Sequence, residues 1–522
     1  MVVPLAAEHT ASIKLRRDVT VWGSYMWGYA DVGADIYTAL GLVIAAAQGA
    51  APLSFALAGL VYVLIGLAYT ELAATYPVAG GGQFFALRGL GDLWGFIAGS
   101  ALALDYIIDI ALFATASAGY VNFFIPAAKL YTVSLGPLGS VNLIWALESL
   151  VLIVFLTWLN IRGIRISSLL NEVLGAIDII LESSIVLFGF AFAFNPDLLV
   201  AQIVNQFPTS YQFMYGTSLA IISFVGLESI SQACQETRRP ATVVPRTSIA
   251  LIITVFTFAV AFSTLGIGLL PWQVFQANIS DPVATMAHAI PYLGILAGPL
   301  AAIMGATILL ISSNSGVMSV SRLAYSMSQF QLMPKWFDAV HPKFHTPYRT
   351  ILVFSGLGAL ATVLSFLTPS SLDTLANMYA FGATTGYIIV FIALFRLRLI
   401  DPYSPRPYKM PFNIRFKYKG EKVEFPVLGI LGLVGVASIL FMVVLTHDIG
   451  RIAGPAWILL AMTGYFLYRG SRKLPLLGNL PRDWEKSQMA VLEEAEEFEL
   501  LEQYKRALSR KGRHGKRNGD AL

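Results

Sequence analysis

The chain has 522 residues, of which 56% are hydrophobic and only 13% are charged, and its mean hydropathy is +0.67. Soluble globular proteins carry about 25% charged residues, so the composition excludes an ordinary soluble protein and predicts an all-α polytopic membrane protein. The single cysteine, Cys234, excludes an intramolecular disulfide. The sequence contains no P-loop pattern, no metal-ligand spacing among its histidines and no catalytic constellation. We therefore expect neither an ATP-driven pump nor an enzyme, and no cofactor.

Apolar runs predict about twelve membrane-spanning helices, because one span needs about 20 mostly apolar residues. The runs lie near 19–47, 52–76, 93–120, 141–160, 168–194, 212–234, 248–270, 291–318, 350–368, 373–396, 426–446 and 453–469. Lys and Arg gather in alternate loops, and Lys14, Arg16 and Arg17 precede the first span. This bias places segments 1–17 and 471–522 in the cytoplasm. We expect a multi-pass protein of the plasma membrane, with no role in binding nucleic acid and an oligomeric state that the sequence leaves open.

The first span contains residues that a spanning helix usually avoids. Between Gly28 and Asp35 it holds two glycines, Gly28 and Gly33, and two carboxylates, Asp31 and Asp35. An ionised acid at mid-bilayer costs about 2.5–3.5 kcal/mol, and each glycine weakens a helix by about 1 kcal/mol relative to alanine. These features predict a helix that is interrupted near its middle and faces a polar site. The alternative is an unbroken helix whose acids face the bundle interior.

The sixth span has a similar composition, with Gly226 and Glu228 near mid-depth. Corresponding interrupted helices in two halves of a chain are typical of inverted-repeat transporters, which bind their substrates near the bilayer midplane. The alternative for Glu228 is a buried structural acid that accepts hydrogen bonds from a hydroxyl group. In the third span, Asp105 and Asp109 are four residues apart and share one helix face, so we expect them to face a cavity. Tyr379 in the tenth span is a further polar candidate.

Four motifs, in order along the chain, give it a resemblance to a known family. They are YTELAATYPVAGGGQFFALRGLG (69–91), LTWLNIRGIRIS (156–167), FVGLESISQACQETRRP (224–240) and NSGVMSVSRLAYSMSQFQLMPKWFDAVHPKFHTP (314–347). Over about 18–470 the chain resembles the amino acid–polyamine–organocation permease superfamily. The resemblance implies the leucine-transporter-like fold, with inverted five-span repeats at about 18–195 and 211–396 and two extra helices at about 426–470. It also implies alternating access.

The resemblance also implies a substrate site. The segment GADIYTALG (33–41) is similar to the first-span pattern in which exposed backbone N–H groups hold a substrate carboxylate. The expected binding residues are Gly33, Ala34 and Ile36 in span 1, and Phe224, Val225 and Gly226 in span 6. Asp35 replaces the usual second glycine, and its carboxylate would oppose that of the substrate unless it is protonated or turned away.

Two functions remain open at this point. The first is import of an amino acid or amine, driven by protons, with Glu228 as the proton-binding group and Asp31 or Asp109 as partners for a proton or a substrate ammonium. The second is potassium–proton symport, because Asp31, Glu228 and Tyr379 match positions of the superfamily's potassium-importer branch (the KimA type). Asp109 departs from that branch, and the soluble tail is shorter than its large cytoplasmic domain.

Overall fold

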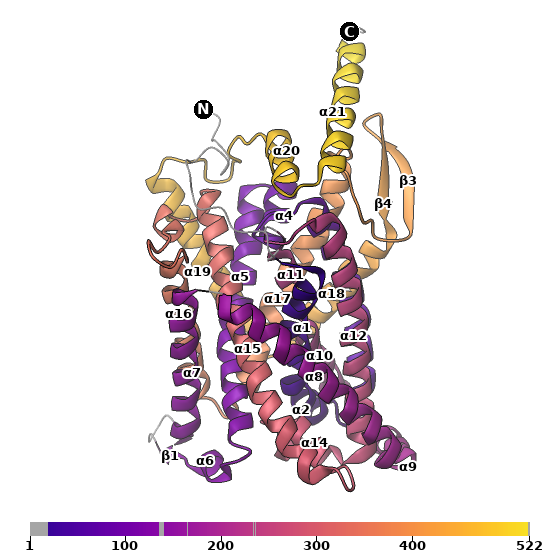
Figure 1. The fold of residues 1–522 in the computed structure, drawn as a ribbon, viewed down its shortest axis with the longest axis vertical. Coiled ribbons are helices and arrows are strands. Elements are labelled where there is room, and N and C mark those ends of the chain that lie inside the picture. The colour runs from indigo at the N-terminus through magenta and orange to yellow at the C-terminus, as the bar shows by residue number, and fades with distance from the viewer. Residues whose placement is uncertain (1–18, 135–139, 164, 233, 235, 520–522) are drawn as a thin grey trace.

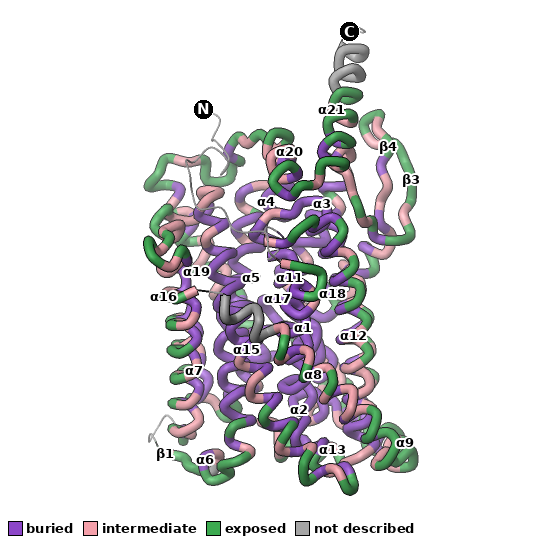
Figure 2. Tube along the Cα trace, in the orientation of Figure 1, coloured by how far each residue is buried: buried purple, intermediate pink, exposed green. Residues whose placement is uncertain are grey.

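The computed structural model describes residues 19–134, 140–163, 165–232, 234 and 236–519. The predicted segment 1–17 lies outside these residues. Long helices run along the long axis of the molecule and form one bundle (Figure 1). Buried residues fill its middle, whereas exposed residues lie on the outer helices and at the two ends (Figure 2).

The spans predicted from the sequence correspond to helices of the bundle. The first two contain α1 (Val21–Val32), the 3₁₀ helix η2 (Gly33–Asp35), α2 (Ile36–Ala47), η3 (Gln48–Ala50) and α3 (Ala51–Thr75). The sixth contains α10 (Ser210–Ala220), η5 (Ile221–Phe224) and α11 (Glu228–Gln232). The other nine are α5 (Asp92–Val121), α7 (Leu143–Arg162), α8 (Arg165–Phe192), α12 (Pro240–Leu269), α15 (Gly294–Gln329), α16 (Tyr348–Ser365), α17 (Ser371–Ile400), α18 (Val427–Thr446) and α19 (Gly450–Ser471).

Further elements connect these helices or follow the last of them. They are α4 (Gly81–Leu90), α6 (Pro126–Leu130), α9 (Pro196–Asn205), α13 (Trp272–Ala277), α14 (Pro282–His288), η7 (Lys335–Asp338), α20 (Trp484–Glu494) and α21 (Phe498–Gly519), with the two-stranded pair β1 (Val133–Ser134) and β2 (Ser140–Val141). A second antiparallel hairpin, β3 (Asn413–Tyr418) and β4 (Glu421–Pro426), lies within the polar segment between α17 and α18. The turn of this hairpin is Lys419–Gly420, and both residues have positive φ, as a two-residue type I′ turn requires.

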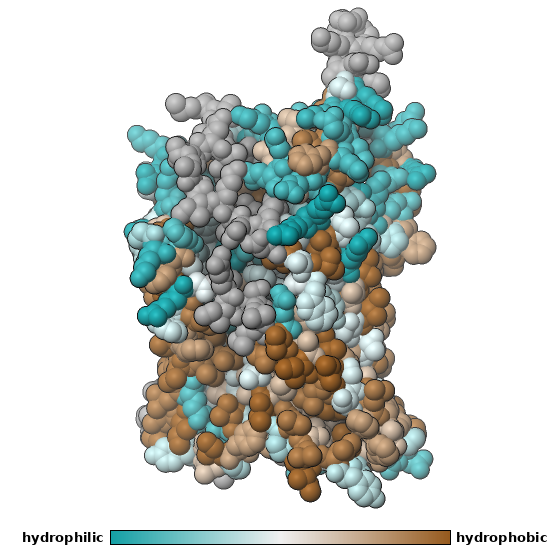
Figure 3. All heavy atoms as spheres, viewed as in Figure 1, coloured by the Kyte–Doolittle hydropathy of each residue, from teal (hydrophilic) through white to brown (hydrophobic). Residues whose placement is uncertain are grey.

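The outer surface has the hydropathy expected of a membrane protein. Within the described residues, ten helical runs are long and apolar enough to cross a bilayer, and the first of them, Val21–Thr75, holds two of the predicted spans. The helix α19 is not among these ten runs, but its 22 residues give a length of about 33 Å, and it exposes apolar side chains such as Leu459 and Leu467. Hydrophilic residues gather at the end of the molecule that carries α21, and hydrophobic residues dominate the rest of the visible face (Figure 3).

Small residues allow the central helices to approach closely. A Cβ atom on Gly59 of α3 would lie 2.5 Å from the Phe256 ring, and one on Gly66 would lie 2.4 Å from Ile252 Cδ1. Both partners belong to α12. Small residues at helix interfaces are typical of membrane bundles, where close van der Waals packing drives association. The α3–α12 contact therefore depends on these two glycines.

Ion pairs attach the C-terminal segment to one end of the bundle. The buried Asp92 carboxylate, at the start of α5, accepts hydrogen bonds from Arg469 and Arg482. Glu497 accepts a hydrogen bond from the backbone N–H of Ala241, at the start of α12 (3.1 Å). Val19, before α1, pairs with Thr237 just upstream of the same helix. The first described residues and the C-terminal helices therefore lie at the same end of the bundle, as an even number of spans requires.

Candidate functional site

The sixth span is broken as the sequence predicts. Val225 has extended backbone angles (φ −88°, ψ 146°), Gly226 has φ 118°, and helical structure resumes only at Glu228. A Cβ on Gly226 would lie 3.0 Å from Asp31 Cγ. Both the positive φ and this close approach require glycine. The break therefore lies directly against the acidic side chain of the first span.

The first span does not unwind, which corrects half of the prediction. Its α-helical hydrogen bonding gives way to a 3₁₀ turn over Gly33–Asp35, but the backbone stays in the right-handed helical region throughout. Asp31 and Asp35 are buried, so tertiary packing outweighs the low helix propensity of this segment. The alternative interpretation, a helix whose acids face the bundle interior, describes the first span better.

Five carboxyl groups converge beside the break. This acid cluster consists of Asp31 and Asp35 from the first span, Asp105 and Asp109 from α5, and Glu228 from α11, and each residue is at most 4% exposed. The five groups lie close enough to interact electrostatically. The helices that carry them contain no Lys, Arg or His. In the described part of the chain, none of the five forms an ion pair. Such a site favours protons or a positively charged group.

The Glu228 side chain accepts hydrogen bonds from two other groups. Its Oε2 accepts a hydrogen bond from the Gly226 backbone N–H (3.1 Å), and both carboxylate oxygens lie 3.0 Å from the Tyr387 hydroxyl. The Asp105 carboxyl is close enough to interact electrostatically with Glu228, but neither of its oxygens has a hydrogen-bond partner within the described residues. The contacts with Gly226 and Tyr387 are also those expected of a structural acid.

The tenth-span tyrosine at Glu228 is Tyr387 rather than Tyr379. Tyr379 packs edge-on against Phe113, with 5.7 Å between ring centroids. The two tyrosines are eight residues apart on α17 and lie on the same side of the helix. Of the three residues that match the potassium-importer branch, Asp31, Glu228 and Tyr379, the tyrosine therefore does not contact Glu228.

Several buried polar atoms of the site have no hydrogen-bond partner within the described residues. They are both carboxylate oxygens of Asp35 and of Asp105, Oδ1 of Asp109, and the hydroxyl oxygens of Ser223, Ser229 and Ser315. More than nine-tenths of buried polar groups in folded proteins are hydrogen-bonded. The site therefore has unused capacity for protons, water or a polar substrate. No three of the described His, Cys, Asp and Glu residues are arranged to hold a metal ion.

The other predicted binding residues line the same region. Ala34 and Ile36 are buried in the first span, and Phe224 stacks on Tyr62 of α3 with 5.2 Å between ring centroids. A cavity of about 10 Å³ is lined by Gly33, Ile36, Ser223 and other side chains, which is about the minimum volume for one water molecule. Gly33 and Ile36 of the first span and Ser223 of the sixth therefore surround one small cavity, whose lining is mostly apolar apart from Ser223 and Glu182.

A second pair of buried acids, Asp178 and Glu182 of α8, was not predicted from the sequence. The Tyr37 hydroxyl donates to Asp178 Oδ1 (2.7 Å), and the Tyr29 hydroxyl donates to Glu182 Oε2 (2.5 Å). Glu182 also lines the cavity beside Ser223. The signal was available, because the two acids are four residues apart within an apolar run, as Asp105 and Asp109 are.

Comparisons with known proteins agree with this architecture. The family model described as amino acid permease matches residues 21–467. The chain belongs to the amino acid permease family. Among its relatives, a branched-chain amino acid permease of Bacillus subtilis is 26% identical, over 90% of this chain and 96% of the relative. A methylthioribose transporter of the same organism is 26% identical over 85% and 91%, and cationic amino acid transporter 4 of Mus musculus is 28% identical over 72% and 58%.

This membership confirms the resemblance to the amino acid–polyamine–organocation superfamily and the all-α polytopic fold. The family and the relatives are permeases and transporters. The permease is therefore a multi-pass membrane transporter and not an enzyme. Its acid cluster, formed by residues of the first span, α5 and the sixth span, lies inside the matched region.

Proposed function

We propose that this permease is a secondary active transporter that imports an amino acid or amine across the plasma membrane, driven by protons, by alternating access. The observation that carries the proposal is the acid cluster beside the broken sixth span, with no basic residue on the helices that hold it. Buried charges are costly unless they are paired or neutralised. A cationic group of the substrate, together with protons, would neutralise this site.

Glu228 is the proposed proton-binding residue. Its carboxylate holds the Gly226 N–H, which is the backbone donor exposed by the break. A proton on Glu228 removes the negative charge and weakens that hydrogen bond, because hydrogen bonds to charged acceptors are the stronger ones. The Gly226 N–H then becomes available to a substrate carboxylate. Proton binding and substrate binding would thus be coupled at one residue.

Asp31 and Asp109 are the proposed partners of the substrate ammonium group. Asp31 lies against Gly226, and Asp109 packs on α15, where a Cβ on Gly316 would lie 2.3 Å from Asp109 Oδ2. The excess of acids favours a substrate with net positive charge, such as an amine or a cationic amino acid. A zwitterionic amino acid would need a proton on Asp35.

The test is uptake into proteoliposomes that contain the purified permease. A panel of labelled amino acids and amines is offered with an inward proton gradient, with and without an uncoupler. The proposal predicts accumulation of at least one amine or amino acid, and the uncoupler should abolish it. A potassium-sensitive dye measures the second candidate function, which the excess of acids also favours. Proton-driven potassium uptake without amino acid or amine uptake would replace the proposed function.

A further inference from the structure

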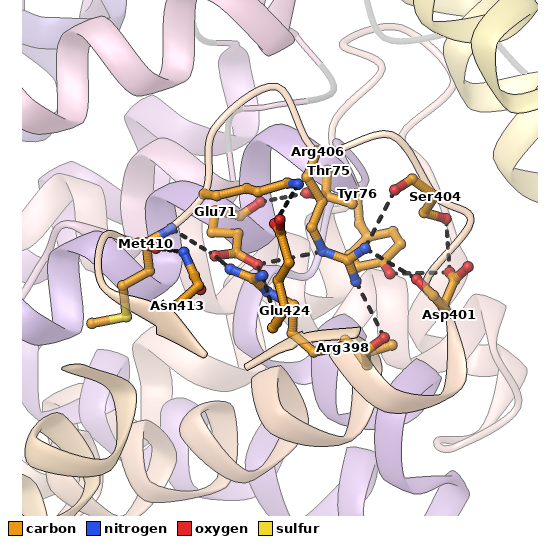
Figure 4. Close-up of polar contacts among 12 residues, drawn as sticks. Glu71, Thr75, Tyr76, Arg398, Asp401, Ser404, Arg406, Met410, Asn413 and Glu424 are labelled. Carbon is orange, nitrogen blue, oxygen red and sulfur yellow. Dashed lines mark hydrogen bonds and ion pairs between the residues drawn. The ribbon is translucent and has the colours of Figure 1, made fainter. Parts of the chain in front are cut away.

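A basic pocket lies at the end of the bundle, away from the transport site. It has a volume of about 550 Å³ and is formed by the end of α17, the segment after it and the β3–β4 hairpin. Figure 4 shows its inner wall, where Glu71, Arg398, Arg406 and Glu424 meet. Six cationic side chains line the pocket, namely Arg398, Arg406, Lys409, Arg415, Lys417 and Lys422, and the lining contains one acid, Glu424.

Four of the six cations of this pocket already have partners. Arg398 donates to both carboxylate oxygens of the buried Glu71 (2.5 and 2.6 Å), and Arg406 lies 3.4 Å from the same carboxylate. Glu424 pairs with Lys409 (2.7 Å) and Arg415 (2.9 Å). Two carboxylates therefore pair with four cations in this region, so the pocket has a net positive charge even without its two remaining cations.

The two remaining cations of the pocket lining have no such partner. Lys417 and Lys422 lie directly opposite each other across the hairpin, both are exposed, and neither forms an ion pair with another described residue. Like charges directly opposite each other destabilise a strand pair. An anion bound between the two lysine side chains would remove this repulsion.

Apolar residues beside the pocket indicate the source of that anion. On β3 and just before it, Phe412 and Ile414 are 74% and 59% exposed. The Phe412 carbonyl accepts a hydrogen bond from the N–H of Val427, the first residue of α18 (3.0 Å), so Phe412 lies where a membrane span begins. Exposed apolar residues of α18, such as Leu431 and Val434, continue from there. This combination of basic and apolar surface suits a lipid better than a soluble anion.

We propose that the pocket binds the phosphate headgroup of an anionic phospholipid from the adjacent leaflet, with the acyl chains along Phe412 and α18. Lys417 and Lys422 would contact the phosphate, in front of the charge already fixed by Arg398 and Arg406. This lipid site is separate from the acid cluster and does not depend on the proposed transport function.

The test measures lipid binding to the full-length protein in detergent by native mass spectrometry, with phosphatidylglycerol, phosphatidylcholine and soluble glycerol phosphate as probes. The variant is Lys417→Gln with Lys422→Gln. The control, Lys419→Gln with Lys473→Gln, removes the same charge from exposed residues outside the pocket lining. We expect the pocket variant to bind phosphatidylglycerol about 30-fold more weakly than the control. Phosphatidylcholine binding should be equal in both.

Two results would overturn the lipid site. One is phosphatidylglycerol binding that is equally tight in the pocket variant and the control. The other is binding of glycerol phosphate without preference for phosphatidylglycerol over phosphatidylcholine, which would assign the pocket to a soluble anion. Both lysines are exposed and their like charges oppose each other across the hairpin, so without added lipid the variant should unfold at a temperature no lower than that of the control. This measurement verifies that the protein is folded.

Discussion

Acidification should destabilise the permease through His447, the residue that follows α18. Its ring is fully buried, its Nε2 lies 2.8 Å from the Ser218 hydroxyl, and it packs edge-on against Tyr215 with 5.0 Å between ring centroids. Burial lowers the pKa of His447 from 6.5 to about 4, against a smaller opposing effect from the backbone of Asn377. Below pH 6.5 the unfolded chain therefore takes up a proton that the folded protein does not.

The sign and size of the effect follow from this difference. The contribution of His447 is complete above pH 6.5 and is lost as the pH falls to about 4, because protonation then favours the unfolded state. The change in pKa to about 4 corresponds to about 3 kcal/mol in the free energy of unfolding, since one pKa unit is about 1.4 kcal/mol.

The assay is denaturant unfolding of the purified protein in detergent between pH 8 and pH 4, for the wild type and for His447→Gln. Glutamine cannot titrate but can still contact the Ser218 hydroxyl. The wild type should lose about 3 kcal/mol more than the variant over this range. Equal losses in the two proteins would refute the reasoning, because other titrating groups are common to both.

Two further substitutions test the fold and the break. Glu71→Gln leaves the buried Arg398 guanidinium without its carboxylate and should lower the free energy of unfolding by about 3–5 kcal/mol. The control Glu424→Gln, at a more exposed pair, should lower it by less than about 1 kcal/mol. Similar losses in the two variants would contradict a larger contribution from the buried pair. Gly226→Ala adds a Cβ at φ 118° and against Asp31 and should cost about 1–3 kcal/mol and abolish uptake. The control Gly464→Ala in α19, with open space at its Cβ, should leave the free energy of unfolding unchanged or raise it. Uptake by Gly226→Ala equal to that of the wild type would contradict the role of the break.

The sequence predicted the spans and one of the two breaks for clear physical reasons. Apolar length alone locates spanning helices, because every backbone polar group in lipid must be satisfied within the helix. The break in span 6 was predictable because Gly226 combines low helix propensity with a neighbouring acid. The same argument was wrong for span 1, where Gly33 remains helical. Local propensity does not show what packs against a helix, and here the burial of Asp31 and Asp35 decides the outcome.

The sequence could not predict which side chains meet. Glu228 contacts Tyr387 rather than Tyr379, and this choice depends on how far along α17 Glu228 lies, because the two tyrosines are about 12 Å apart along the helix axis. Asp178 was overlooked although its spacing from Glu182 was visible in the sequence. The β3–β4 hairpin between α17 and α18 was not predicted from the sequence.

The role of Glu228 in proton coupling can be tested most directly in proteoliposomes with an imposed inward proton gradient. The measurement compares accumulation and exchange of a transported amine or amino acid by the wild type, by Glu228→Gln and by the control Glu148→Gln, whose residue accepts a hydrogen bond from Asn122 outside the acid cluster. Glu228→Gln should fold and exchange substrate but lose proton-driven accumulation, whereas the control should accumulate substrate normally. Accumulation by Glu228→Gln equal to that of the wild type would contradict proton coupling at Glu228 and make Asp109 the next candidate.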